Sequence, residues 1–379
     1  MRSRLRPGSY DLTPIAETSG RFTDFAPYVP AIDDRGVVAF QATGRRGGSG
    51  VYQGDGGPVS PVIDSRTSPL TNVCSHPDIN ASGAACFYAE LGAGRRSVVL
   101  AQDGGMTIIA DNAGPLGPTM NDRGTVAFRA DLGPGGSGIY TGRDGLIRSI
   151  AATGDVFSAF YGLPVINSHG VVAFRADLTS GAQGIFLGDG GPPVVVAETG
   201  VVLSSLGHFP VLDDGGSVAF CAGLAGGGSG VFVASAGLLE TVVDTTAAFE
   251  SFRGVLLGDA GQLVYYGTPR GGQLGLFTGR DPRRDCIVRV GGALLDSTID
   301  EFALNPVSIN RLGQVAIRVT LASGRQVVVR ADPRVPRRPR APSWSLAGVD
   351  ASGSIAGSTV AYAVPTDQVR PEPLRSEVQ

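Results

Sequence analysis

The sequence predicts an all-β fold, a seven-bladed β-propeller with four-stranded blades whose ring is closed by the N-terminal strand. Three observations lead to this prediction. A motif, Pro-x-Ile-Asn-x-x-Gly-x-Val-Ala-Phe, occurs seven times, and its glycines lie 41 to 52 residues apart, which suits one propeller blade per repeat. The segments between the motifs are short β-branched or aromatic runs separated by turn residues, without helical periodicity. The last repeat lacks a fourth strand that the N-terminus can supply.

The motif itself predicts a strand followed by a tight turn. We expect the first strand of each repeat to be the short Pro-x-Ile-Asn segment. The turn that follows has Asn or Asp at its first position in six of seven copies and Gly at its fourth. A short polar side chain caps such a turn, and glycine adopts the backbone conformation that other residues resist. These positions are therefore interpreted as structural, and the seven glycines are Gly36, Gly83, Gly124, Gly170, Gly216, Gly261 and Gly313.

The remaining strands of each repeat follow in a fixed order. The second strand is Val-Ala-Phe-x-Ala, as in 126–132, and the third is a Gly-Ile-Tyr or Gly-Val-Phe segment, as in 138–140. A glycine-rich turn then leads to the fourth strand, for example 193–200. Such short runs of β-branched and aromatic residues favour strands.

The two ends of the chain together predict how the ring closes. The seventh repeat contains its first three strands, at 307–310, 314–321 and 326–331, and then enters a Pro/Arg-rich segment. Residues 13–18 instead match the fourth strand of the fourth repeat, 194–200. The N-terminal strand should therefore complete the last blade and remove its exposed edge.

This pattern divides the chain into two parts. The propeller should span residues 10–331. Residues 332–379 are rich first in Pro and Arg and then in Ser and Gly, so we expect a mostly disordered tail.

Composition restricts the class of function. The chain carries only 17% charged residues and a net charge of −3, which argues against nucleic-acid binding. It contains no lysine, so all 31 basic residues are arginines and lysine-dependent phosphate loops and Schiff bases are excluded. The hydrophobic fraction of 42% is too high for a disordered chain.

Compartment and assembly are expectations from the same reading. The first twenty residues lack the apolar run of a secretory signal, and no stretch reaches 18 apolar residues. We therefore expect a cytoplasmic bacterial protein, a monomer without a membrane span. Its four cysteines lack metal-ligand spacing and are interpreted as free thiols.

The repeat resembles that of the bacterial NxxGxxAF tandem-repeat proteins, often grouped by their choice of anchor. The resemblance covers roughly residues 10–331 and rests on the motif copies described above. It implies a propeller and, in many members, secretion or surface anchoring. It implies no catalytic residues.

Variation between the repeats points to a candidate binding face. The connections from each fourth strand to the next first strand are long and varied, and they share one face with the connections between second and third strands; by analogy with other propellers this face binds ligands. The long connections are 65–77, 153–164, 199–210, 245–254 and 291–306. The candidate ligand-binding residues are Tyr28, His76, Tyr161, His208, Arg253, Asp300 and Glu301.

Two interpretations of these residues stay open. His76 or His208, which the repeat places on opposite sides of the channel, could act as a general base with Asp300 or Glu301. The alternative is a hydrogen-bonded structural histidine. Three histidines are too few for a catalytic metal site, so we expect no metal and no cofactor.

The leading functional hypothesis is a binding scaffold for a small molecule, a glycan or a protein. The alternative is an enzyme, a lyase, hydrolase or cyclase acting on a small molecule or polysaccharide at the same face. An enzyme should place His76 or His208 within hydrogen-bond reach of a carboxylate or tyrosine in a funnel, and a scaffold should not.

Overall fold

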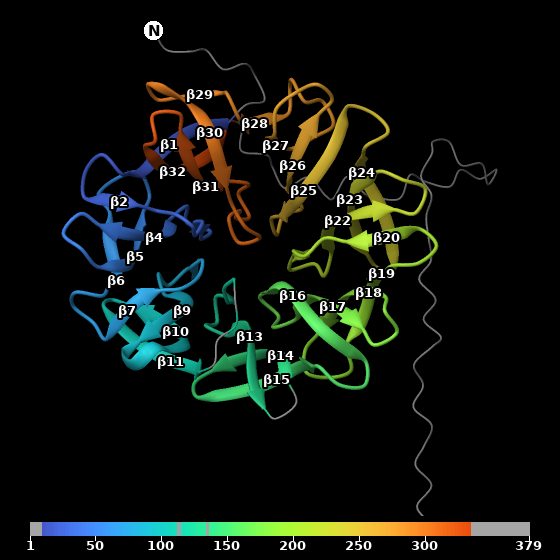
Figure 1. The fold of residues 1–379 in the computed structure, drawn as a ribbon, viewed down its shortest axis with the longest axis horizontal. Coiled ribbons are helices and arrows are strands. Elements are labelled where there is room, and N and C mark those ends of the chain that lie inside the picture. The colour runs from blue at the N-terminus through green and yellow to red at the C-terminus, as the bar shows by residue number, and fades with distance from the viewer. Residues whose placement is uncertain (1–9, 112–113, 115, 134–135, 335–379) are drawn as a thin grey trace, which may run out of the picture.

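The protein is an all-β propeller of seven blades arranged around a central axis (Figure 1). A computed structural model describes residues 10–111, 114, 116–133 and 136–334. Within these residues the only helix is the single 3-10 turn Gly92–Gly94. The predicted fold class is confirmed. The disorder predicted for the tail concerns residues that, from 335 onward, lie outside the described ones.

Each blade is an antiparallel sheet that runs from an inner strand near the axis to an outer strand at the rim. From inner to outer, the first blade contains β2 (Phe22–Asp24) with β3 (Ala31–Ile32), β4 (Val38–Gly44), β5 (Ser49–Gly54) and β6 (Ser60–Asp64), and the second contains β7 (Leu70–Val73) with β8 (Asp78–Ile79), β9 (Ala85–Leu91), β10 (Arg95–Gln102) and β11 (Gly105–Asp111). In the same order, the third blade contains β12 (Thr119–Met120), β13 (Val126–Gly133), β14 (Gly136–Arg143) and β15 (Leu146–Ala152), and the fourth contains β16 (Phe157–Ile166), β17 (Val172–Leu178), β18 (Gln183–Gly188) and β19 (Val194–Glu198).

The last three blades follow the same plan, except that the seventh takes its outer strand from the N-terminus. Their strands are: β20 (Leu203–Leu206) with β21 (Val211–Leu212), β22 (Val218–Leu224), β23 (Ser229–Ser235), β24 (Leu238–Asp244); β25 (Phe249–Leu257), β26 (Leu263–Pro269), β27 (Gly275–Phe277), β28 (Cys286–Arg289); β30 (Ser297–Ala303) with β29 (Ala293–Leu294), β31 (Val315–Leu321), β32 (Gln326–Pro333), β1 (Tyr10–Glu17).

Ring closure occurs where the sequence predicts it. Strand β1 pairs antiparallel with β32, and Figure 1 shows both strands in the same blade. Ile15 of β1 is buried against Phe22 and Phe40 of the first blade and Val328 of the seventh. Strands β1 and β32 therefore both contribute to the contact between the seventh blade and the first.

The repeated turn works as the motif predicts and also links neighbouring blades. In the fourth blade the Asn167 side-chain oxygen accepts hydrogen bonds from the backbone amides of His169 and Val171, at 3.1 and 3.0 Å. Its amide nitrogen donates to the backbone oxygen of Asp213 in the next blade. Gly170 completes the turn with φ +88°, and the other six motif glycines also have positive φ.

The expectation for the first strands is wrong in its bounds. In every blade except the third, the inner strand begins well before the Pro-x-Ile-Asn segment, because parts of the expected connections are themselves strands: β2, β7, β20, β30 and the first halves of β16 and β25. In β16 a β-bulge after Phe157 inserts one residue into the strand. The bulge lets Phe157 and Phe160 both point into the blade core, where their ring centroids lie 5.4 Å apart. In a regular strand, residues three apart point to opposite faces.

The same bulge recurs in the first, second, fifth, sixth and seventh blades. The aromatic pairs Phe22/Phe25 and Phe249/Phe252 lie 5.6 and 5.4 Å apart and pack on the aromatic residues of the second and third strands. These phenylalanines therefore belong to the packing of the blades.

Candidate functional site

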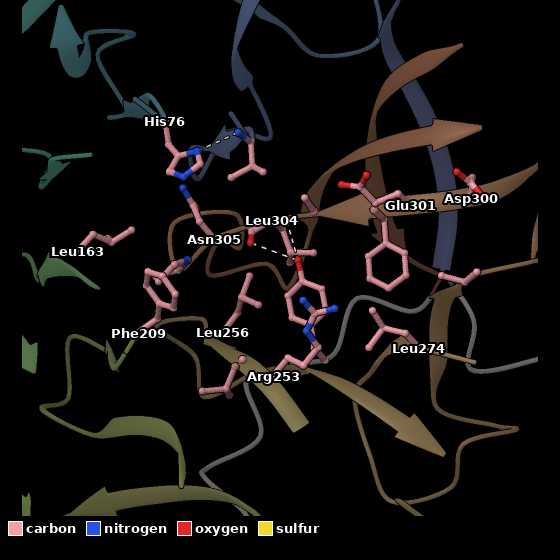
Figure 2. A pocket seen from close by; sticks show the side chains of 18 residues that line it. His76, Leu163, Phe209, Arg253, Leu256, Leu274, Asp300, Glu301, Leu304 and Asn305 are labelled. Carbon is pink, nitrogen blue, oxygen red and sulfur yellow. Dashed lines mark hydrogen bonds between the residues drawn. The ribbon is translucent and has the colours of Figure 1, made fainter. Parts of the chain in front are cut away.

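A cavity of about 560 Å³ lies at the axis, beside the residues that directly precede the Pro-x-Ile-Asn segments of several blades. We call it the axial cavity (Figure 2). Its walls come from six of the seven blades, and it reaches outward between the sixth and seventh. The apolar part of its lining consists of Val29, Leu163, Phe209, Val255, Leu256, Leu274, Val290, Phe302, Ala303, Leu304 and Pro306. The other lining residues are His76, Arg253, Gly254, Tyr266, Asp300, Glu301 and Asn305.

His76 lies just before strand β8 of the second blade and faces the axis. Its Nδ1 accepts a hydrogen bond of 3.0 Å from the backbone N–H of Val29 in the first blade (Figure 2). An imidazole nitrogen that accepts carries no proton, so the neutral ring must carry its proton on Nε2. Burial, with a smaller contribution from the Arg318 guanidinium, lowers the pKa of His76 to about 4. At neutral pH the side chain is therefore an uncharged hydrogen-bond donor.

Asn305 presents a second neutral donor. Its side-chain oxygen accepts from the backbone N–H of Val307 and from the Ser308 hydroxyl, both at 3.1 Å. The side chain is oriented by these bonds, and its amide nitrogen points toward the His76 ring in Figure 2. Asn305 is 8% exposed, so this polar end of the cavity is largely shielded from bulk water.

The charged groups lie at another part of the cavity. Asp300 and Glu301 of β30 are exposed, and so is Arg253 of β25. Figure 2 shows Asp300 and Glu301 on the opposite side of the view from His76. Glu301 pairs at 3.3 Å with Arg318, whose side chain is only 8% exposed and whose Nε has no hydrogen-bond partner among the described residues.

A tyrosine of the sixth blade is hydrogen-bonded to the backbone of the seventh blade at the cavity wall. The Tyr266 hydroxyl donates to the backbone oxygen of Leu304 at 3.2 Å and accepts from the Leu304 N–H at 2.7 Å. Burial raises the pKa of Tyr266 well above its usual value. This hydroxyl therefore serves as a structural contact and remains protonated.

Three of the predicted site residues lie outside the axial cavity lining. Tyr28 packs edge-on against the His76 ring, with centroids 5.5 Å apart. Tyr161 packs against His208 across the boundary between the fourth and fifth blades, and the Arg175 guanidinium lies 4.4 Å from the Tyr161 ring centre. The predicted candidates His76, Arg253, Asp300 and Glu301 do line the cavity together.

Two blades approach each other closely beside His208. Gly162 of the fourth blade has φ +68°, and a Cβ atom there would lie 1.7 Å from the His208 backbone oxygen. Only glycine fits this approach. The contact of His208 with Gly162 and Tyr161 is thus a packing contact between the fourth and fifth blades.

Another part of the channel is lined by the motif turns and is rich in aspartate. There the carboxylates belong to the frame of the ring. Asp122 accepts from the Ala81 N–H at 2.8 Å, Asp214 from the Ser168 N–H at 2.8 Å, and Asp34 from the Arg311 N–H at 3.1 Å. Each of these bonds joins two blades.

No group of three or more metal-ligating side chains is present in the part of the chain that the structure describes. The same residues contain no helix with the length and hydrophobicity that crossing a membrane requires.

Comparison with known proteins identifies a family. A model of a family of unknown function, DUF7453, matches residues 120–326, more than half of the chain. The chain belongs to the DUF7453 family. No curated protein matches it in sequence.

Solved structures support the fold of this DUF7453 member. It is similar to a puromycin-hydrolyzing peptidase of Mycobacterium tuberculosis, with 16% identity and a TM-score of 0.52, over 89% of this chain and 56% of that one. It is also similar to prolyl oligopeptidase B of Galerina marginata, with 9% identity and a TM-score of 0.51, over 84% of this chain and 52% of that one. The chain thus spans about half the length of either peptidase, and the likeness concerns the fold alone.

Sequence reasoning missed three important residues: Asn305, Tyr266 and Arg318. Asn305 lies two residues before the last copy of the motif, a position at which the other repeats carry no asparagine. Tyr266 and Arg318 occupy the residue after the Val-Ala-Phe positions, in the middle of otherwise apolar strands. A polar side chain at such a buried position was the available signal.

Proposed function

We propose that this DUF7453 protein is a ligand-binding scaffold and that the axial cavity is its binding site. The proposed ligand is a small molecule, or one apolar group of a larger glycan or protein. The observation that carries the proposal is the hydrogen bond from the Val29 N–H to His76 Nδ1, which leaves the cavity histidine as a donor.

This hydrogen bond argues against a general base. A base needs a free lone pair aimed at the substrate proton. In His76 the Nδ1 lone pair is engaged at 3.0 Å, and Nε2 carries the proton. No hydrogen bond joins His76 or His208 to a carboxylate or tyrosine among the described residues. The arrangement that would favour the enzyme alternative is therefore missing from the described chain.

The size and lining of the cavity support binding. Small-molecule sites are typically concave, mostly apolar and about 300–1,000 Å³, with a few placed polar groups. The axial cavity, at about 560 Å³, has such an apolar lining, with His76 and Asn305 as oriented polar groups. This concave form favours a small ligand or a single inserted group.

The test is to plug the cavity. Gly254 of β25 lines it, and a Cβ there would make only ordinary contacts, 3.5 Å from the Tyr266 ring. Gly254→Phe should therefore fold and fill the space. We expect the apolar dye 8-anilinonaphthalene-1-sulfonate to bind the wild-type protein saturably at one site, measured by fluorescence titration, and to lose at least tenfold in affinity in Gly254→Phe.

Gly200→Phe is the matched control. Gly200 is exposed, its Cβ would meet nothing within 4 Å, and it belongs to another of the long connections. Dye affinity should be unchanged in this variant. Equal affinity in the wild-type protein and Gly254→Phe would show that the axial cavity is not the binding site.

We also propose that the chain is related to the NxxGxxAF choice-of-anchor proteins. This kinship is supported by the seven motif copies and their common turn geometry.

A further inference from the structure

We infer that the axial cavity selects ligands with a carboxylate at one end and an apolar body, and that His76 and Asn305 bind the carboxylate. This inference rests on the proposed binding function. It is drawn from the two hydrogen-bond donors at the polar end of the cavity and from the apolar wall that continues from them.

The polar end of the cavity offers hydrogen-bond donors, and the acceptor atoms of its two side chains are already occupied. The Nδ1 atom of His76 is engaged by Val29, so the ring presents Nε2–H. The side-chain oxygen of Asn305 is engaged by Val307 and Ser308, so this residue presents its NH₂ group. Both side chains line the cavity, and Figure 2 shows them next to each other. An oxygen that accepts from both satisfies this end of the cavity, whereas an ammonium group finds no acceptor there.

The electrostatic surroundings favour a negative oxygen. Arg318 pairs across the strand ladder with Ala303, which lines the cavity. Its guanidinium is almost completely buried and has one Nε–H without a partner among the described residues. The positive charge of Arg318 acts at His76, where it contributes to lowering the pKa. Its ion-pair partner Glu301 is 62% exposed, so water screens that negative charge more effectively.

The rest of the cavity fits an apolar body. Leu256, Leu274, Val290 and Phe302 form a wall between the sixth and seventh blades. The carboxylates of Asp300 and Glu301 lie on the side of Figure 2 opposite to His76. Between these carboxylates and the two donors, the apolar wall offers no partner for a second anionic group. A monocarboxylate with one apolar chain therefore matches the lining better than a dicarboxylate.

The experiment compares four probes that share an eight-carbon chain: octanoate, octanamide, octanol and octylamine. Each displaces the bound dye from the full-length protein at pH 7.5, and its inhibition constant is measured. We expect octanoate to bind at least tenfold more tightly than octylamine, with the neutral probes between them. Gly254→Phe should abolish displacement by all four.

Asn305→Asp is the decisive variant. The new carboxylate keeps an acceptor for Val307 and Ser308 but replaces the NH₂ donor with an anionic oxygen. Octanoate affinity should fall at least tenfold and octylamine affinity should rise. His76→Phe should also weaken octanoate. His208→Phe should leave octanoate affinity unchanged, because the His208 ring packs against Tyr161 and Phe209 and is not itself part of the cavity lining. Thermal melts establish that each variant folds.

The outcomes separate the inference from the proposed function. If all four probes bind with equal affinity and Gly254→Phe removes them, the carboxylate preference is wrong and the binding site stands. If octylamine binds as well as octanoate in wild type and Asn305→Asp alike, the inference is also overturned. If none of the probes or the dye binds in the cavity, both proposals fail.

Discussion

Ile15 provides the strongest test of ring closure, because a single side chain connects the two ends of the described fold. It is 6% exposed and packs with residues of the first and seventh blades. Replacing it with alanine removes three carbon atoms, worth about 2.4 kcal/mol at about 0.8 kcal/mol each. The cavity left behind adds to this loss, so we expect Ile15→Ala to lower the free energy of unfolding by about 3–4 kcal/mol.

Ile147→Ala is the matched control. Ile147 lies on β15, the outer strand of the third blade, and is 45% exposed. About half of its transfer free energy is already absent in the folded state, and its removal leaves no enclosed cavity. The free energy of unfolding should therefore fall by only about 1.2 kcal/mol.

Urea unfolding followed by far-UV circular dichroism measures both effects on the full chain. An Ile15→Ala variant no less stable than Ile147→Ala would refute the reasoning. A deletion through Glu17 extends the test, since it removes the strand that pairs with β32 and leaves that strand as an open edge. This deletion should lower the unfolding midpoint far more than either substitution, and an unchanged midpoint would contradict closure by the N-terminus.

Three further predictions concern the frame of the ring. Tyr266→Phe leaves the buried backbone groups of Leu304 unpaired, so denaturant unfolding should show a loss of about 1–3 kcal/mol. Asn167→Ala removes three hydrogen bonds and should cost about 2–3 kcal/mol, whereas Asn167→Asp keeps the two acceptor bonds and should cost about 1 kcal/mol in the same assay. Burial raises the pKa of Asp78 to about 7, so the folded protein holds that proton more tightly than the unfolded chain; stability should fall between about pH 4 and pH 7, and less steeply in Asp78→Asn.

Much of the fold could be predicted because its signals are local and repeated. The turn at Asn167 and Gly170 needs one side-chain acceptor and one residue with positive φ, and both are visible in the sequence. The closing strand was found because the missing element of one repeat matches a segment elsewhere in the chain. The beginnings of the inner strands were missed, because a bulge changes the spacing of their buried residues from two to three.

The candidate site could be predicted only in part. Four of the residues that line the axial cavity were among the candidates chosen from the variation between repeats. The separation of His208 from the cavity did not follow, because Gly162 permits an approach that places His208 against Tyr161. Cytoplasmic localisation, the monomeric state and the boundaries of the propeller remain predictions.

The sequence by itself determined the strand type, the repeated turn, the number of blades and the strand that completes the last one. These properties depend on residues close together in the chain or on copies of one pattern. The tertiary structure decided which polar groups meet at the axis. His76 and Asn305 belong to the second and seventh blades, and their donor roles depend on hydrogen bonds from Val29, Val307 and Ser308. The chemistry of the cavity arises where different blades converge, and a repeat pattern carries no information about which side chains face each other there.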